Sequence, residues 1–121
     1  MKLTLVGCSH HNAPLALRER VALDAAGAAA LAERLGPESV VLSTCNRTEL
    51  YLAREEHDEE RAVEVLAELA GDAAPELEAA LYRLRDDAAA LHLFRVAPGT
   101  SESSPAATRK RCSAAASSRS R

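Results

Sequence analysis

No leucine, isoleucine, valine, methionine or phenylalanine follows Val96 in this chain of 121 residues. Because these side chains supply most of the apolar surface that a fold buries, the C-terminal residues cannot build a core of their own. The charge divides at nearly the same place, since residues 1–99 hold 10 Lys and Arg against 17 Asp and Glu, whereas residues 100–121 hold 5 basic residues and 1 acidic residue. The sequence therefore predicts a single domain over residues 1–99 and a disordered Ser/Ala/Arg-rich tail over residues 100–121.

The composition of residues 1–99 restricts the classes of protein to which the domain can belong. The chain has only one Phe and two Tyr, so the core must be aliphatic. An acidic domain with so few stacking side chains gives little support to nucleic-acid binding, and the basic tail offers only weak, salt-sensitive attraction. The sequence has no uncharged apolar run of about 18 residues and no apolar signal-peptide stretch, so we expect a cytoplasmic protein with no membrane partner.

Apolar periodicity and end signals predict an α+β fold, with helices packed on a mostly antiparallel sheet. Asn12 is expected to cap the first helix with Pro14 in its first turn, Asp24 precedes the second helix, and Gly36 and Gly71 end two helices. Asp86 or Asp87 begins the last helix. The predicted strands cover residues 2–7, 39–44 and 47–53, the predicted helices cover residues 12–23, 25–35, 57–71 and 86–98, and residues 76–85 suit either a helix over 76–81 or a strand over 81–85.

The stretch "STCNRTELYLA", residues 43–53, places Cys45 between Thr44 and Arg47 at the junction of two predicted strands. A nearby cation, hydroxyl and amide donors and a loop position are the features that lower the pKa of a thiol. From the pattern alone, a cysteine after an apolar strand is more often a small buried hydrophobic residue. The three cysteines are odd in number and no export signal precedes them, so free thiols are predicted.

Other residues offer weaker candidates for chemistry. Cys8, His10, His11 and Cys45 together present two sulfur and two nitrogen ligands, but their spacing is poor for zinc, and no metal site is predicted. His92 stands beside apolar neighbours on a predicted helix, where it is either a partly buried polar residue or a group that exchanges protons near neutral pH. No glycine-rich phosphate-binding motif is present.

Three segments nevertheless resemble one family in order and spacing: "VGCSHHNAPLALRE" (6–19), "VVLSTCNRTELY" (40–51) and "LHLFRVAPG" (91–99). Over residues 1–99 the chain is similar to the N-terminal catalytic domain of glutamyl-tRNA reductase, and the S-T-C-N-R-T-E motif is highly specific. The family reduces glutamyl-tRNA to glutamate-1-semialdehyde with NADPH, through a cysteine thioester, at the start of tetrapyrrole biosynthesis.

The resemblance implies a role for several residues. Cys45 corresponds to the nucleophile and His92 to an activity-supporting histidine, while Thr44, Asn46 and Arg47 belong to the substrate-binding segment. Arg47 either lowers the pKa of Cys45 or binds the glutamyl carboxylate. The implied partner is glutamyl-tRNA, and the implied cofactor is NADPH.

The chain also departs from the family pattern. After residue 99 the family continues with a G-L-D-S segment, whereas Glu102 stands here in place of a substrate-contacting serine. The NADPH-binding domain and the domain that makes the family homodimeric are absent, so we expect a truncated or frameshifted copy that binds no NADPH and performs at most the first half-reaction. The alternatives are a non-catalytic module that binds glutamyl-tRNA or a pathway partner, and a metal-binding regulator built on Cys8, His10 and Cys45.

Overall fold

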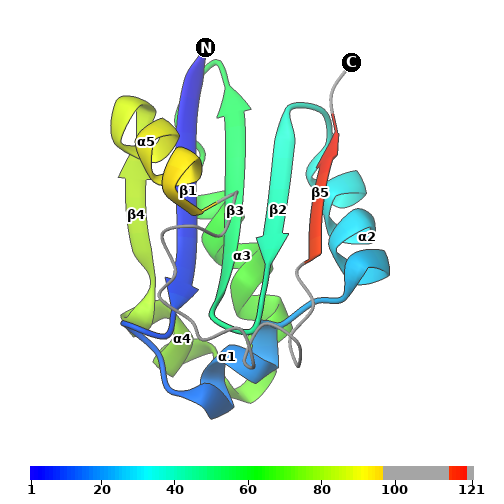
Figure 1. The fold of residues 1–121 in the computed structure, drawn as a ribbon, viewed down its shortest axis with the longest axis vertical. Helices are drawn as coiled ribbons and strands as arrows, with labels where there is room; N and C mark the ends of the chain where they lie inside the picture. Colours follow the sequence, from blue (N-terminus) through cyan, green and yellow to red (C-terminus); the bar gives the residue numbers. More distant parts are fainter. Residues whose placement is uncertain (97–114, 120–121) are drawn as a thin grey trace.

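A single five-stranded sheet organises the protein (Figure 1). The structure is a computed structural model that describes residues 1–96 and 115–119. The strand order is β4-β1-β3-β2-β5, and every neighbouring pair is antiparallel. The strands are β1 (Lys2–Ser9), β2 (Ser39–Ser43), β3 (Arg47–Arg54), β4 (Tyr82–Arg85) and β5 (Ala115–Arg119). The helices are α1 (Leu15–Val21), α2 (Ala25–Leu35), α3 (Glu59–Ala70), the short 3-10 turn η1 (Gly71–Ala73), α4 (Ala74–Ala80) and α5 (Asp86–Val96). The predicted α+β class with an antiparallel sheet is confirmed.

The two faces of the sheet are covered unequally. Helices α1 to α4 contribute to one large aliphatic core, in which Leu50 and Leu52 of β3 are fully buried. On the opposite face α5 lies over β1 and β4 (Figure 1), and Ala89 packs there with Leu5 and Tyr51. Because successive side chains of a strand point to opposite faces, Leu50 and Leu52 share the large core while Tyr51 joins the smaller one. The expectation that Leu50 and Leu52 share a face is confirmed.

Most helix-end signals act as the sequence predicts. The Asp24 carboxylate accepts a hydrogen bond from the Gly27 N–H at 2.7 Å and so caps α2. Gly36 follows α2 with a φ of 93°, and its N–H donates to the Ala32 carbonyl. Gly71 ends α3 in the same way, with a φ of 59°. The ambiguous segment contains both predicted elements, since α4 ends before Leu81 and β4 follows it.

The start of α1 differs from the prediction. Pro14 is its N-cap residue, and the helix begins at Leu15 rather than after Asn12. The Asn12 side chain does not cap α1, because its Oδ1 accepts a hydrogen bond from Ser9 Oγ at 3.1 Å. A proline disfavours helical geometry in the residue before it, so Ala13 cannot begin the helix.

Two strands also extend beyond the predicted pattern. β1 continues through Gly7 to Ser9, because residues on both sides of Gly7 remain paired with β3. Residues 115–119, which the sequence places in a disordered tail, form β5 along the open edge of β2. An edge strand offers unpaired backbone groups, which an added antiparallel strand can pair. The rest of the predicted tail lies outside the described residues, and no helix within the described part is long and apolar enough to span a bilayer.

Candidate active site

The turn between β2 and β3 is shaped by Thr44. Its Oγ1 accepts hydrogen bonds from the N–H groups of Asn46 at 3.1 Å and Arg47 at 3.2 Å, and its own N–H donates to the Arg47 carbonyl at 2.7 Å. The Asn46 carbonyl in turn accepts from the His10 N–H at 2.8 Å. Two of the predicted substrate-binding residues, Thr44 and Asn46, therefore hold the turn in shape and join it to the loop after β1.

Cys45 occupies the middle of this turn and is half-buried. Its carbonyl accepts a hydrogen bond from Arg18 Nη1 at 2.7 Å, while Arg18 Nε donates to the Ala13 carbonyl at 3.1 Å. The cation in contact with the Cys45 backbone thus comes from α1. Cys45 is disulfide-bonded in the structure. The prediction of a free thiol is therefore wrong for this residue.

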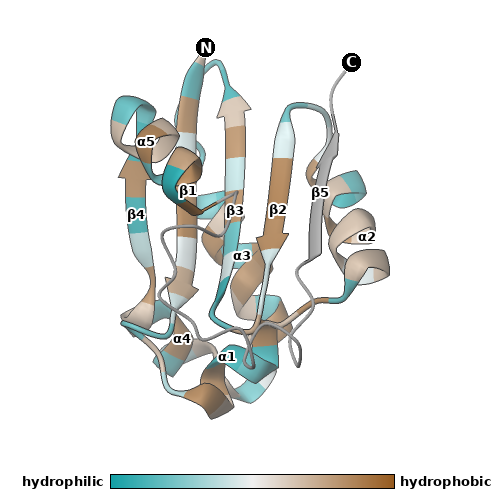
Figure 2. Ribbon diagram, viewed as in Figure 1, coloured by the Kyte–Doolittle hydropathy of each residue, from teal (hydrophilic) through white to brown (hydrophobic). Residues whose placement is uncertain are grey.

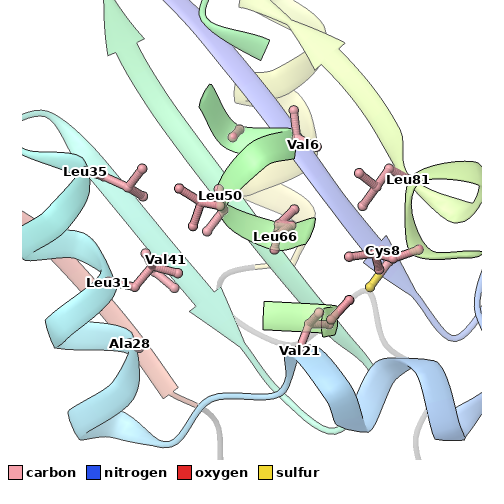
Figure 3. Packing of buried hydrophobic residues seen from close by; sticks show 14 of the residues in the cluster. Val6, Cys8, Val21, Ala28, Leu31, Leu35, Val41, Leu50, Leu66 and Leu81 are labelled. Carbon is pink, nitrogen blue, oxygen red and sulfur yellow. The ribbon is translucent and has the colours of Figure 1, made fainter. Parts of the chain in front are cut away.

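Cys8 is a free thiol in a different environment. It is fully buried in the large core, where Figure 3 shows it near Val21 and Leu81. Burial raises the pKa of the Cys8 thiol, so the protonated form is favoured. His10 and His11 are exposed on the following loop, with their ring centroids 3.9 Å apart. Among residues 1–96 and 115–119 no three His, Cys, Asp or Glu side chains gather as a metal site, so the zinc alternative gains no support.

Arg47 and His92 meet at a buried carboxylate. Glu49 is fully buried and Arg47 is 7% exposed. Arg47 Nη1 lies 3.2 Å from Glu49 Oε2, and His92 Nε2 lies 2.6 Å from the same oxygen. Arg47 Nη1 is also 3.3 Å from His92 Nε2. The structure therefore brings together two of the predicted site residues, although they lie on β3 and α5.

Two tyrosines complete the surroundings of Glu49. Tyr51 donates its hydroxyl hydrogen to Oε1 at 2.7 Å, and Tyr82 of β4 donates to Oε2. Burial, followed by the charge of Glu49, raises the pKa of both phenols above the ordinary value. We call these five residues the Glu49 cluster: Arg47, Glu49, Tyr51, Tyr82 and His92.

The sequence reasoning missed Glu49, Tyr51 and Tyr82 as site residues. A signal for part of the cluster is present, since Arg47, Glu49 and Tyr51 alternate along β3 and so share one face of the sheet. Figure 2 shows the start of β3 in the teal of hydrophilic residues, although Arg47 and Glu49 are buried there. When every second residue of a buried strand is polar, the face of the sheet to which those residues point is a candidate polar site.

The cluster borders a cavity of about 350 Å³. It is lined by Ser9, His11, Asn12, Arg47, Tyr82, Leu84, His92, Arg95 and Val96. Thr44, Cys45 and Asn46 are not among these lining residues, so of residues 44–47 only Arg47, the first residue of β3, borders the cavity. A larger groove of about 850 Å³ along α3 is lined mainly by carboxylates and contains none of the predicted site residues. Chemistry rather than size identifies the smaller cavity as the candidate site.

Comparison with known proteins agrees with the motif at the β2–β3 turn. Residues 6–101 match the family described as glutamyl-tRNAGlu reductase, N-terminal domain. The chain belongs to this family. The match contains the whole Glu49 cluster as well as the Cys45 turn. The predicted resemblance is therefore confirmed.

Two members of the family show how much of the longer enzyme this chain represents. A glutamyl-tRNA reductase from Polaromonas naphthalenivorans (strain CJ2) is 42% identical over 106 residues, which cover 82% of this chain and 24% of that protein. The solved structure of glutamyl-tRNA reductase from Methanopyrus kandleri matches with a TM-score of 0.56 and 29% identity, over 84% of this chain and 23% of the other. The chain spans about a quarter of the length of these relatives.

Proposed function

We propose that residues 1–96 form the acyl-transfer part of a cytoplasmic glutamyl-tRNA reductase, in which reduced Cys45 accepts the glutamyl group of glutamyl-tRNA. The observation that carries the proposal is that Arg47 and His92 line one cavity and both contact buried Glu49, while Arg47 begins the strand that follows the Cys45 turn. Membership of the family supports the substrate class, because both relatives are named glutamyl-tRNA reductase.

In the proposed step the Cys45 thiolate attacks the ester carbonyl between glutamate and the tRNA ribose. A carbon–sulfur bond forms, the carbon–oxygen bond to the ribose breaks, and the ribose oxygen receives a proton from His92. The products are a Cys45 thioester and tRNA with a free terminal hydroxyl. Cys45 must first be released from its disulfide, since a disulfide sulfur is not a nucleophile.

The two arginines near the turn have separate proposed roles. Arg18 donates to the Cys45 carbonyl, which places its positive charge beside the residue that must ionise. Arg47 lines the cavity and contacts Glu49 and His92 instead. We therefore assign Arg47 to the anionic carboxylate of the glutamyl group, and Arg18 to the Cys45 thiolate. Direct substrate binding by Thr44 and Asn46 stays a prediction.

The described residues do not fit NADPH, the reductant that the family resemblance implies. A dinucleotide is commonly held where a glycine-rich turn joins a strand of a parallel sheet to a helix. All strand pairs among the described residues are antiparallel, and the sequence contains no G-x-G-x-x-G motif. We therefore propose no hydride step for this chain.

The test is incubation of reduced protein with glutamyl-tRNA labelled in the amino acid. Wild type and Cys8→Ser should form labelled protein and release free glutamate, whereas Cys45→Ser should not. The rate should be slow, because Glu102 replaces a substrate-contacting serine of the family pattern. Misplacement of the ester by about 1 Å lowers the rate about a hundredfold. Equal labelling of Cys45→Ser would remove Cys45 from the reaction. Formation of the semialdehyde with NADPH would contradict the restriction to acyl transfer.

A second candidate is a non-catalytic module that binds glutamyl-tRNA, since the disulfide occupies the Cys45 sulfur that acyl transfer needs. In that case the oxidised and reduced proteins should bind glutamyl-tRNA equally in a filter-binding assay, and reduction should produce no labelled protein. Labelling that appears only after reduction would favour acyl transfer.

A further inference from the structure

We propose that Glu49 is a positioning residue that keeps a proton on Nε2 of His92 and leaves Nδ1 as the ring nitrogen that exchanges a proton with the substrate. The identity of the substrate in this inference rests on the proposed acyl transfer. The arrangement of the ring itself follows from the contacts of Glu49.

The distances decide which hydrogen bond His92 makes. Nε2 is 2.6 Å from Glu49 Oε2 and 3.3 Å from Arg47 Nη1. An arginine nitrogen is only a donor, so a hydrogen bond from Arg47 to Nε2 would require Nε2 to carry no proton. The shorter contact joins Nε2 to an acceptor oxygen and requires Nε2–H. The proton therefore lies on Nε2, and Arg47 directs its own donation to Glu49.

The rest of the Glu49 cluster supports the same assignment. Besides His92, the carboxylate is contacted by Arg47, Tyr51 and Tyr82, and each of them presents a donor. An ionised carboxylate accepts about four hydrogen bonds and donates none. A fully buried carboxylate is costly unless it is paired and hydrogen-bonded, and these four neighbours satisfy it. With every neighbour acting as a donor, the carboxylate accepts the Nε2 proton.

The consequence concerns the other ring nitrogen. His92 lines the cavity and its side chain is 23% exposed, so the ring reaches both the carboxylate and the open space. Loss of the Nε2 proton would remove one of the donors around buried Glu49. In the proposed ester cleavage, Nδ1–H of the imidazolium gives its proton to the departing ribose oxygen. The neutral ring that remains keeps its Nε2–H and its bond to Glu49.

Nuclear magnetic resonance of the reduced protein, labelled with nitrogen-15 in histidine, tests the proposal without any tRNA. The four histidines are His10, His11, His57 and His92, and His92→Gln assigns the relevant signals. At a pH where the ring is neutral, His92 should show a protonated Nε2, an unprotonated Nδ1, and a ring N–H signal protected from exchange with water. Glu49→Met, which has a similar length and no acceptor oxygen, should lose that protection.

Tyr51→Phe is the matched control, because Tyr51 donates to Oε1, the Glu49 oxygen that does not contact His92. This variant disturbs the same buried cluster and should retain the protected Nε2–H. A wild-type ring protonated on Nδ1 would overturn the proposal, as would an unchanged signal in Glu49→Met or an equal loss in both variants. If Glu49→Met does not fold, Glu49→Asp withdraws the carboxylate by one methylene and should also lose the protection. If the His92 ring shows the expected protonation but no glutamyl group is transferred to the protein, the proposed acyl transfer is rejected and the positioning role of Glu49 stands.

Discussion

Gly7 and Glu49 face each other across the antiparallel β1–β3 pair, and a Cβ atom on Gly7 would lie 2.7 Å from Glu49 Cγ and 2.8 Å from the Thr48 carbonyl oxygen. Cβ atoms in proteins essentially never approach other heavy atoms within 3.0 Å. The absence of a side chain at Gly7 therefore gives the buried Glu49 side chain the space that it occupies. A backbone position on β1 thus determines where the centre of the Glu49 cluster lies.

Gly7→Ala should accordingly destabilise the protein and displace Glu49. Overpacking of a dense interior typically costs about 1–3 kcal/mol, and urea denaturation measures the change. Gly27→Ala is the comparison, because a Cβ there would lie 3.1 Å from Asp24 Oδ1 and 3.3 Å from Leu23 Cδ2, which are side-chain atoms at longer distances than those at Gly7. An unfolding midpoint for Gly7→Ala as high as that of wild type would contradict the proposed close packing.

After reduction, Cys45 should be alkylated at neutral pH faster than Cys8. Cys45 is half-buried beside Arg18, whereas Cys8 is fully buried and its thiol pKa is raised. Each unit of difference in pKa changes the thiolate fraction about tenfold below both pKa values. Limited iodoacetamide treatment followed by mass spectrometry ranks the sites, with Cys112, which lies outside the described residues, as a reference. If Cys8 reacts as fast as Cys45, the activated-thiol interpretation loses its physical basis.

The Asp86 carboxylate should make the protein less stable in acid. It accepts the Leu3 N–H at 3.0 Å and lies 3.0 Å from His57 Nε2, and these contacts hold the pKa of Asp86 below its usual value. A depressed pKa contributes stability above the unfolded value of about 3.9, and that stability is lost as the pH falls through the folded value.

Asp86→Asn tests this contribution. The residue has a φ of 50°, a conformation that asparagine also adopts readily, so the substitution removes mainly the charge. The variant should be less stable at neutral pH, and its free energy of unfolding should fall less than that of wild type below about pH 4. If the free energy of unfolding falls with decreasing pH by the same amount in both proteins, Asp86 contributes nothing to the acid sensitivity.

The purified protein should hold no stoichiometric zinc, and a chelator should not change its stability. The candidate ligands are separated in the structure, since Cys8 is in the core and His10 and His11 are exposed. Metal analysis and thermal unfolding with and without chelator check this expectation, because metal binding and folding are coupled at structural zinc sites. One equivalent of zinc, with Cys8 and Cys45 both protected from alkylation, would restore the metal-binding alternative.

Local signals account for the features that the sequence predicts well. The Asp24 cap, the glycines after α2 and α3 and the alternation along β3 each depend on residues within one turn or strand, so the fold class and most element positions follow from them. The first helix cap was mispredicted because the proline that follows Ala13 outweighs the capping tendency of Asn12. The pairing of residues 115–119 with β2 joins segments more than 70 positions apart, so no local pattern in the sequence indicates it.

The sequence by itself determined the family, through the specific S-T-C-N-R-T-E motif, and the resemblance implied separate roles for Arg47 in substrate binding and for His92 in catalysis. Only the tertiary structure decided that both contact Glu49, because the contact between His92 and Glu49 joins residues 43 positions apart on different elements. It also separated the two described cysteines, placing Cys8 in the core and Cys45 in an accessible turn. Burial and proximity arise from packing between distant segments, and no local pattern of residues specifies them.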